Sequence, residues 1–305
     1  MSRIAVIGGL NMDLHLFGVQ EWAGQAPLVA EHYFAEPGGK GANVARAAAR
    51  LGADVSLVGR IGDDEFGRHC VTVISDDGVD TRAVRVTPHE PTGFVAIELA
   101  EGKHRSLLFA PGANDHLTWA DIEPALSELQ PEDIVIAQAE LPPQAIGELA
   151  RHTNSTGATL FLDPTPPDRV TGELLAAAEV ITPSHAEAAA LVGRADHSPL
   201  SPALAASDLL RSGARRVLIK LGELGALLAE GERTELIPTL SIVPEDETGA
   251  GDVFLAALAV RRSERAAWSE ATLFANAASA MSVAATGLKL PDRAEVDAAL
   301  TQLVR

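Results

Sequence analysis

The sequence predicts an α/β fold in which helices cover both faces of a mostly parallel central sheet. From residue 118 onward, short apolar runs alternate with polar loops and helical segments, and this unit repeats several times. Strands that are buried on both faces read as continuous apolar runs, and helical crossovers between them make the sheet parallel. The 305 residues show no linker, repeat or low-complexity tract, so we expect one domain over residues 1–305.

A second group of predicted strands does not fit this alternation. The runs 92–99 and 104–109 flank a short turn that contains a glycine, which is typical of a β-hairpin. Residues 14–37 show no helical periodicity, and 29–34 reads as a short strand. We expect a small sheet, formed by the segments 14–37 and 92–110, that stands off the main body. The exposed strands of such a sheet must be covered by a substrate or by a second subunit.

The composition excludes several classes of protein. Apolar residues make up 47% of the chain and charged residues 22%, which is ordinary for a globular protein. The net charge of −18 argues against nucleic acid or an anionic membrane as a partner. The single cysteine, Cys70, excludes an internal disulfide and a multi-cysteine metal site. No apolar run approaches the roughly 18 residues of a membrane span, and residues 1–8 are too short for a signal sequence, so we expect a cytoplasmic protein.

The first predicted strand covers residues 4–7 and ends at two glycines. A strand followed by glycines is typical of dinucleotide-binding proteins, but their fingerprint needs three glycines in the order G-x-G-x-x-G. The loop here reads Gly8-Gly9-Leu10-Asn11-Met12-Asp13 and lacks the second and third of these glycines in place. A nicotinamide cofactor is therefore not expected.

A glycine-rich loop precedes the first predicted helix. Residues 37–43 read Pro-Gly-Gly-Lys-Gly-Ala-Asn, residues 44–51 are helical in pattern, and Gly52 follows as a helix stop. No G-x-x-x-x-G-K-[ST] pattern can be read through this loop, so it is not a P-loop. Its glycines serve either a ligand or only the close packing of the helix start. A strand over 54–59 and an acid-rich helix start at 63–66 come next.

The alternation that follows supplies the remaining elements. Thr118 and Asp121 form a capping-box pattern, and Pro142-Pro143 starts another helix. Strands are predicted over 134–136, 159–162, 180–183 and 217–220, and C-terminal helices over 250–262, 269–285 and 292–303. Ligands of such sheets bind at the carboxyl ends of the strands. The positions just past strand ends, which we expect to converge on one edge, are Asn11, Asp13, Glu140, Glu187 and Gly222.

The stretch from Asp246 to Asp252 is the strongest candidate for chemistry. It reads Asp-Glu-Thr-Gly-Ala-Gly-Asp and runs directly into an apolar helical segment. At a helix N-terminus the backbone amides have no internal partner and the dipole is positive. Gly249, Ala250 and Gly251 can therefore point bare amides at a phosphate, and Asp252 can accept a hydroxyl proton. The alternative is that Asp252 only complements the helix dipole.

Three blocks occur in order along the chain: residues 38–43 with the downstream run 60–67, then Glu140 with the strand-end pair Asp163-Pro164, and last 246–252. Together they resemble the ribokinase-like (PfkB) family of carbohydrate kinases. Weaker similarities at 9–13, 111–114 and 274–278 extend the resemblance over essentially the whole chain. The resemblance implies a three-layer α/β/α sandwich with a small β-sheet lid, which corresponds to the small sheet inferred above.

The resemblance also implies an activity, the ATP-dependent phosphorylation of a hydroxymethyl group. Asp252 would remove the alcohol proton, and the amides of Gly249, Ala250 and Gly251 would hold the transferring phosphate. The hydroxyl loses its proton as phosphorus takes its oxygen, so the position of the carboxylate matters more than its pKa. A furanose sugar is the expected acceptor, and the conversion of ribose to ribose 5-phosphate is the favoured reaction.

The family pattern assigns residues to both substrates. The implied acceptor-binding residues are Asn11, Asp13, Gly39, Lys40, Asn43 and Glu140. Carboxylates and amides suit a polyol because each can form paired hydrogen bonds with hydroxyl groups. The implied nucleotide-binding residues are Ser184, Lys220, Gly222, Gly225, Gly251 and Asn276, with Glu187 organising Mg²⁺ through water. As alternatives, Lys40 could face solvent, and Gly222 and Gly225 could be ordinary turn glycines.

Two departures from the family pattern matter. The family has N-x-x-E where this chain reads Ser184-His185-Ala186-Glu187, which is also a capping box, so a phosphate contact by Ser184 is left open. Asp246 and Thr248 match ligands of an activating monovalent cation in potassium-dependent members. Glu247 replaces a second threonine, and the loop 286–291 lacks the usual hydroxyl, so activation by K⁺ is left open too.

Other functions stay as alternatives. A nucleoside kinase for adenosine, inosine or cytidine would need an aromatic partner for the base, and the candidates are Trp22, Tyr33, Phe34, Phe94 and Phe109. A fructokinase-like hexose kinase ranks third. A non-catalytic sugar or nucleotide sensor is disfavoured because the motif that ends at Asp252 is intact. Apart from the sugar or nucleoside and ATP, we expect a homodimer formed through the lid, and no nucleic-acid or membrane partner.

Overall fold

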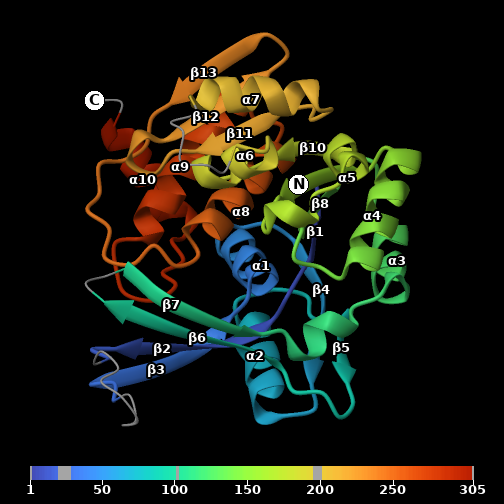
Figure 1. Ribbon diagram of the computed structural model, residues 1–305, viewed down its shortest axis with the longest axis vertical. Coiled ribbons are helices and arrows are strands. Elements are labelled where there is room, and N and C mark those ends of the chain that lie inside the picture. The colour runs from blue at the N-terminus through green and yellow to red at the C-terminus, as the bar shows by residue number, and fades with distance from the viewer. Residues whose placement is uncertain (1, 20–28, 101–102, 195–200, 304–305) are drawn as a thin grey trace.

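The computed structural model describes residues 2–19, 29–100, 103–194 and 201–303. A nine-stranded, mostly parallel sheet forms the centre, helices flank it, and a separate four-stranded sheet stands beside it (Figure 1). The predicted α/β sandwich with a second, small sheet is therefore confirmed. Within the described part of the chain, no helix is both long and apolar enough to cross a membrane.

The central sheet contains β1 (Ile4–Ile7), β4 (Val55–Gly62), β5 (Val84–Thr87), β8 (Ile134–Gln138), β9 (Thr159–Asp163), β10 (Ala178–Ile181), β11 (Val217–Lys220), β12 (Ala226–Glu230) and β13 (Arg233–Ile237). Their order is β13-β12-β11-β10-β9-β8-β1-β4-β5, and all neighbours from β11 to β5 are parallel. The sequence did not predict β5 and β13, because both lie at the edges of the sheet and expose most of their residues. It also missed β12, whose alanines and leucines are good helix formers.

Helices cover both faces of this sheet. One face packs against α1 (Lys40–Arg50), α2 (Glu65–Asp76), α8 (Ala250–Ser263), α9 (Trp268–Ser282) and α10 (Arg293–Leu303). The other packs against α3 (Trp119–Ser127), α4 (Pro143–Thr156), α5 (Gly172–Ala177), α6 (His185–Leu191) and α7 (Pro202–Arg211). Short 3₁₀ helices cover Gly112–His116, Pro167–Arg169 and Gly222–Leu224. Each face of the sheet has its own apolar core, and strand residues alternate between them. Ile134 and Ile136 pack into the core with α8, and Val135 and Ala137 pack into the core with α4.

The small sheet contains β2 (Asn11–Phe17), β3 (His32–Gly38), β6 (Gly93–Ala100) and β7 (Lys103–Ala110), in the order β3-β2-β6-β7. It begins at Asn11, earlier than the sequence indicated, so Asn11 and Asp13 lie within β2 rather than in a loop past β1. Both are buried, and polar residues at buried positions hid the strand pattern. The strand expected at 29–34 begins instead at His32. The candidate Trp22 and the turn residues Glu101 and Gly102 lie outside the described residues.

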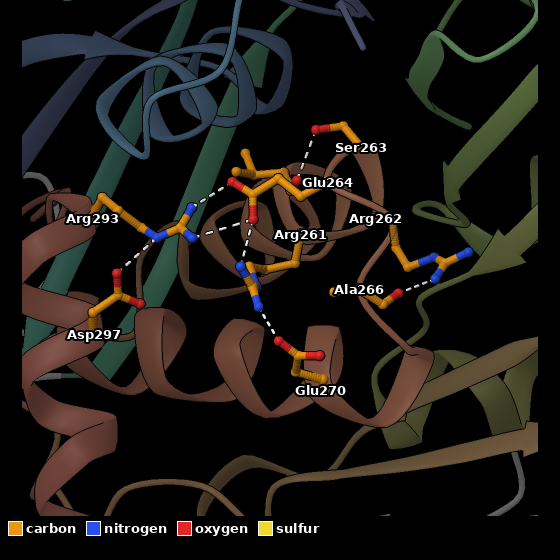
Figure 2. Close-up of polar contacts among 9 residues, drawn as sticks. Arg261, Arg262, Ser263, Glu264, Ala266, Glu270, Arg293 and Asp297 are labelled. Carbon is orange, nitrogen blue, oxygen red and sulfur yellow. Dashed lines mark hydrogen bonds and ion pairs between the residues drawn. The ribbon is translucent and has the colours of Figure 1, made fainter. Parts of the chain in front are cut away.

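Helix α8 carries the candidate catalytic residues at its N-terminus. Its residues 252–260 are buried without interruption, which explains the apolar run in the sequence. A polar cluster holds its other end (Figure 2), where Glu264 accepts hydrogen bonds from Arg261 on α8 and from Arg293 on α10. Arg261 also contacts Glu270 on α9. The cluster therefore connects the C-terminal end of α8 to α9 and α10.

Candidate active site

The N-terminus of α8 forms a tight turn at Gly249. This residue has φ 71°, in the left-handed region, and the side chain of Leu288 occupies the space that a Cβ atom would need. The amides of Gly251 and Asp252 follow in the first helical turn, where the helix itself provides no acceptor. The amide of Ala250 already donates to the carbonyl oxygen of Glu247 at 3.3 Å. The turn therefore presents the positive end of a buried helix to an anion.

Asp252 is buried in this first turn and its carboxylate is held from two sides. Asn43 Nδ2 donates to Asp252 Oδ2 at 2.9 Å, and Lys40 Nζ lies 3.4 Å from Asp252 Oδ1. Burial raises the pKa of Asp252 above its ordinary value, Asp163 acts in the same direction, and Lys40 and Asn43 oppose the shift. The residue is thus a fixed carboxylate with more proton affinity than an exposed aspartate.

Lys40 lies between two carboxylates and does not extend into solvent. Its Nζ donates to Asp163 Oδ2 at 2.8 Å, in addition to the contact with Asp252. Burial alone would lower the pKa of Lys40, but the charges of Asp163, Asp252 and Glu140 raise it well above its ordinary value. Burial alone would raise the pKa of Asp163, but Lys40 and Lys220 outweigh it and lower that pKa to about 2. Lys40 is therefore a permanent cation at the centre of the site.

Two residues near Asp252 have a buried acceptor atom without a partner among the described residues. Asp13 Oδ1 and Asn43 Oδ1 have no hydrogen bond to any of the described residues. Burial raises the pKa of Asp13 to about 7, with Glu36 and Asp252 adding to the shift and His15 opposing it. Buried polar atoms normally have a partner, so unpaired acceptors mark a place where a ligand supplies donors.

The loop after β1 and the start of α1 pack closely beneath these residues. Gly39 has φ 91°, and a Cβ atom there would come within 2.7 Å of the Gly9 carbonyl oxygen and 2.9 Å of the Asn11 nitrogen. Asn114 donates to Asn11 Oδ1 at 2.9 Å and accepts from the backbone nitrogen of Leu10 at 3.0 Å. These contacts fix the start of β2, and they fix Asn11 with it.

Glu140 follows β8 and borders a cleft of about 300 Å³. Phe109 on β7, Asn114 and Arg169 also line this cleft. Burial raises the pKa of Glu140 to about 7, although the charge of Lys40 opposes the shift. Arg169 donates to the carbonyl oxygen of Glu140 at 2.8 Å and so fixes its backbone.

On the other side of Lys40, Glu187 and Asp163 are joined by Thr165. Thr165 Oγ1 lies 2.6 Å from Glu187 Oε1 and 2.7 Å from Asp163 Oδ1. Ser184 and Glu187 form the predicted capping box: Glu187 Oε2 accepts from the Ser184 nitrogen at 2.6 Å, and Ser184 Oγ from the Glu187 nitrogen at 3.2 Å. The Ser184 hydroxyl thus has a structural task at the start of α6, and a phosphate contact by it stays a prediction.

Lys220 extends from the end of β11 toward the turn at α8. Its Nζ lies 3.0 Å from the position that a Cβ atom on Gly251 would occupy. The adjacent loop contains Gly222 and Gly225, both with positive φ. A Cβ on Gly225 would overlap the carbonyl oxygen of Ile237, whereas Gly222 has open space around it. Lys220 therefore adds a second cation at the open end of α8.

Asn276 fixes the chain beside Gly225 rather than pointing into open space. Its Nδ2 donates to the carbonyl oxygens of Ile237 and Pro238, each at 2.9 Å. Thr239 Oγ1 donates to the Asn276 carbonyl oxygen at 3.0 Å. A direct nucleotide contact by Asn276 stays a prediction.

Asp246 lies buried beneath the turn and binds two backbone segments. Its Oδ1 accepts from the nitrogen of Thr248 at 2.9 Å and from Thr248 Oγ1 at 2.6 Å. Its Oδ2 accepts from the nitrogen of Gly287 at 3.0 Å. The carboxylate therefore joins the turn at α8 to the loop after α9.

Sequence reasoning did not assign a role to Asp163, Thr165 or Asn114. Asp163-Pro164 stood at a predicted strand end, and Asn114 stood in one of the weaker family similarities, so both carried a signal. Thr165 carried none, because a hydroxyl in a proline-rich loop is common. In the structure Asp163 accepts a hydrogen bond from Lys40, and Asn114 donates one to Asn11.

Comparisons with known proteins identify the family of this chain. Residues 1–294 match the sequence pattern of the pfkB family of carbohydrate kinases. A ribokinase from Bacillus subtilis is 34% identical over 303 residues, which cover 99% of this chain and 100% of the relative. A crystal structure of a ribokinase from Thermotoga maritima has a TM-score of 0.87 and 30% identity, covering 99% of this chain and 100% of that one. A structure of Arabidopsis thaliana ribokinase complexed with ribose and ATP has a TM-score of 0.87 and 28% identity, covering 98% of each chain. The chain therefore belongs to the pfkB family of carbohydrate kinases and is an ATP-dependent phosphotransferase with an alcohol group as acceptor.

Proposed function

We propose that this protein phosphorylates the hydroxymethyl group of a furanose, with ribose as the favoured acceptor and ribose 5-phosphate as the product. The observation that carries the proposal is the pair of unpaired acceptors, Asp13 Oδ1 and Asn43 Oδ1, close to the buried acid Asp252. A polyol supplies the hydroxyl donors that both atoms lack among the described residues. The relatives named ribokinase, one of them solved with ribose and ATP, support this choice of acceptor.

In this proposal the acceptor is held between the small sheet and the main body. Asn11 and Asp13 on β2 take hydroxyl groups from one side, and Asn43 and Glu140 take them from the other. Hydroxyl groups donate to carboxylate oxygens, so the ionised forms of Asp13 and Glu140 are the ones that bind. Lys40 and the backbone of Gly39 complete the site at the start of α1.

Phosphoryl transfer forms a bond from the acceptor oxygen to the γ-phosphorus while the bond from phosphorus to the ADP oxygen breaks. The hydroxyl proton passes to Asp252, which acts as the general base. Asn43 and Lys40 hold its carboxylate in place, so the base is positioned before the acceptor binds. In this proposal the backbone amides of Gly249, Ala250 and Gly251 form the anion hole, the Ala250 amide exchanging the Glu247 carbonyl oxygen for a phosphate oxygen, and Lys220 adds a positive charge beside it.

Mg²⁺ accompanies ATP in this proposal, and the oxygen atoms around Thr165 fit such a cation. The single hydroxyl proton of Thr165 cannot serve both Asp163 Oδ1 and Glu187 Oε1. Asp163 Oδ1 also accepts from the Thr165 nitrogen at 3.2 Å, so Glu187 Oε1 is the atom that can accept from a hydrated hard cation. Glu187 acts on this cation through water in the proposal; no group of three or more His, Cys, Asp or Glu that could hold a metal directly occurs in the described ranges. Bound Mg²⁺ neutralises phosphate charge. K⁺, in turn, would act through Asp246 and Thr248, which join the turn at α8 to the loop after α9.

The small sheet acts as a lid over the acceptor, within a single domain that spans the chain. Its edge strands expose apolar side chains: Tyr33 and Leu108 are each 70% exposed and Leu107 is 56% exposed. A second copy of the chain, docked through these strands, would cover them and form the proposed homodimer.

A nucleoside kinase is the second candidate, because Phe109 lines the cleft that Glu140 borders. Phe34 stacks on His15 with 4.4 Å between ring centroids, and Phe94 lies 6.2 Å from Phe66. Both rings are thus engaged in packing at the small sheet. Of the candidate aromatic residues that the structure describes, Phe109 is the one that lines this cleft, so it would be the partner of a base.

A coupled assay of ADP release over ribose, fructose, adenosine, inosine and cytidine tests the proposal. We expect ribose to give the highest kcat/KM. Signal from nucleosides alone would reject the favoured acceptor and support the second candidate. Running the assay in potassium and in tetramethylammonium salts tests the cation, since equal rates exclude activation through Asp246.

A further inference from the structure

The loop after α9 packs directly on the small sheet. The backbone nitrogen of Leu288 donates to Glu36 Oε1 on β3 at 3.1 Å. A Cβ atom on Gly287 would lie 3.1 Å from Glu36 Oε1 and 3.2 Å from Phe34 Cζ, and Gly287 has φ 78°. The loop backbone thus lies close to β3: a Cβ at position 287 would require Glu36 or Phe34 to shift by a few tenths of an ångström, and the positive φ favours glycine.

The same two residues of the loop also contact the turn at α8. The side chain of Leu288 fills the space beside Gly249 that a Cβ atom would need. The nitrogen of Gly287 donates to Asp246 Oδ2, and Asp246 Oδ1 accepts from Thr248, one residue before Gly249. One short segment therefore touches the lid on one side and the phosphate-holding turn on the other.

On the lid side of this segment, Glu36 has the buried His15 as its neighbour. His15 Nε2 lies 3.2 Å from Glu36 Oε1, and His15 is fully buried and stacked on Phe34. Burial alone would raise the pKa of Glu36, but His15, the Leu288 amide and Arg46 lower it, so Glu36 is an anion. Glu36 is also the direct cross-strand partner of Asp13. The strand pair that carries the acceptor-binding Asp13 therefore carries the contact to Leu288.

We propose that Glu36 is a positioning residue that couples acceptor binding at Asp13 to the geometry of the turn at Gly249, through Leu288. The inference rests on the proposed roles of Asp13 and Gly249. When the acceptor orders β2 and β3, Glu36 holds Leu288 against Gly249 and keeps its amide turn in the left-handed conformation. Without the hydrogen bond between Glu36 and Leu288, the loop separates from β3. Acceptor binding at β2 and β3 then no longer changes the geometry of the turn at Gly249.

Two substitutions at Glu36 separate the hydrogen bond from the charge. Glu36→Gln keeps an oxygen that accepts from the Leu288 amide, whereas Glu36→Leu keeps the volume and removes the acceptor. We expect Glu36→Leu to lower kcat by about tenfold to a hundredfold, because small displacements of catalytic groups have effects of this size. We expect Glu36→Gln to recover kcat to within about threefold of the unchanged protein, since the positioning contact is retained.

Leu288→Ala tests the contact between Leu288 and Gly249. It also provides a test of the proposal if Glu36→Leu fails to fold. We expect Leu288→Ala to lower kcat too. The kcat of a Glu36→Leu/Leu288→Ala protein should be at most about threefold below that of the less active single variant, because both changes interrupt the same series of contacts. Glu31→Leu is the matched control. Glu31 is an exposed carboxylate just before β3, and we expect its loss to leave kcat unchanged.

Ligand-binding and hydrogen-exchange measurements distinguish a positioning role of Glu36 from a role in stability alone. Wild-type protein should bind the acceptor more tightly in the presence of a non-hydrolysable ATP analogue, and Glu36→Leu should lose this enhancement while each ligand alone binds as before. Hydrogen exchange at residues 249–252 should speed up in Glu36→Leu and not in Glu36→Gln, and this needs no acceptor. Unchanged kcat and exchange in Glu36→Leu, or equal loss in both Glu36 variants, would overturn the inference. A wild-type protein that phosphorylates no sugar would reject the proposed function instead, and the exchange experiment would still decide the role of Glu36.

Discussion

Asp13 and Glu140, the two carboxyl groups proposed to hold the acceptor, each have a pKa that burial raises to about 7. The same groups titrate near pH 4 in an unfolded chain. Between about pH 4 and 7 the folded protein therefore keeps protons that the unfolded chain has released. The protonated carboxyl groups of Asp13 and Glu140 therefore contribute to the free energy of unfolding. This contribution is fully present below about pH 4 and is lost as the pH rises through 7. Acceptor binding needs the opposite state, because hydroxyl groups donate to ionised carboxylates.

We accordingly expect kcat/KM for the acceptor to rise with pH and to level off above about pH 7. The melting temperature should fall over the same interval, and this fall should be smaller in the Asp13→Asn/Glu140→Gln protein. A pH series of kcat/KM with a thermal unfolding series checks both trends. A kcat/KM that is flat from pH 5.5 to 8 would contradict the assignment of these carboxylates to acceptor binding.

Single residues also show where sequence reasoning ended. Asp252 and Asn43 stood in motifs, and the structure joins them by a hydrogen bond of 2.9 Å. Glu36 and His15 carried no motif, because their partners lie on the opposite strand and in a loop near the C-terminus. Contacts between residues far apart in sequence leave no local pattern, so they could not be predicted.

At the scale of elements, α8 is held at its two ends by different means. Its N-terminus is fixed by the turn at Gly249, and its C-terminus by Glu264, which accepts hydrogen bonds from Arg261 and Arg293 (Figure 2). Burial alone would raise the pKa of Glu264, but Arg293 and Arg261 lower it. The ion pairs of Glu264 therefore stabilise the folded protein above the unfolded pKa of about 4.3, and this stabilisation is lost as the pH falls through the folded pKa of Glu264.

Replacing Glu264 by Gln should destabilise the protein by about 1–3 kcal/mol, because the guanidinium groups of Arg261 and Arg293 each lose the more buried of their two carboxylate partners. The proposed catalytic turn lies at the far end of α8, about 20 Å away for a helix of this length, so kcat should change little. Denaturant unfolding and steady-state kinetics measure the two effects. Asp297→Asn is the control: Asp297 binds the same Arg293 but is 55% exposed, and its loss should cost less than about 1 kcal/mol. Equal costs for both variants would show that burial of the cluster is not what stabilises it.

Elements were predictable to the extent that they were buried on both faces. The strands predicted at 134–136, 159–162 and 217–220 lie within β8, β9 and β11, and the one predicted at 180–183 overlaps β10, which covers Ala178–Ile181. The edge strands β5 and β13 lack continuous apolar runs because they face solvent. The segment assigned to the small sheet began only at residue 14, because the buried polar residues Asn11 and Asp13 interrupt the apolar pattern at the start of β2.

At the scale of the whole molecule, the exposed edge strands of the small sheet predict a dimer. Leu108→Lys places a charge in the middle of the apolar surface of β7, where Leu108 is 70% exposed. We expect the unchanged protein to sediment as a dimer and Leu108→Lys to sediment as a monomer, since burying an unpaired charge costs several kcal/mol. Val243→Lys is the control, because Val243 is 87% exposed in a loop outside the small sheet. Dimers of unchanged stability in Leu108→Lys would place the interface elsewhere.

The assignment of Asp252 as the base connects the acceptor site, the turn at Gly249 and the lid in one reaction. Asp252→Asn keeps the size of the side chain and removes its capacity to take a proton. The central measurement is kcat of this variant together with its affinity for ATP. We expect kcat to fall by about a thousandfold or more while the ATP dissociation constant stays within about threefold. Turnover close to that of the unchanged protein would contradict the role of Asp252 as the base.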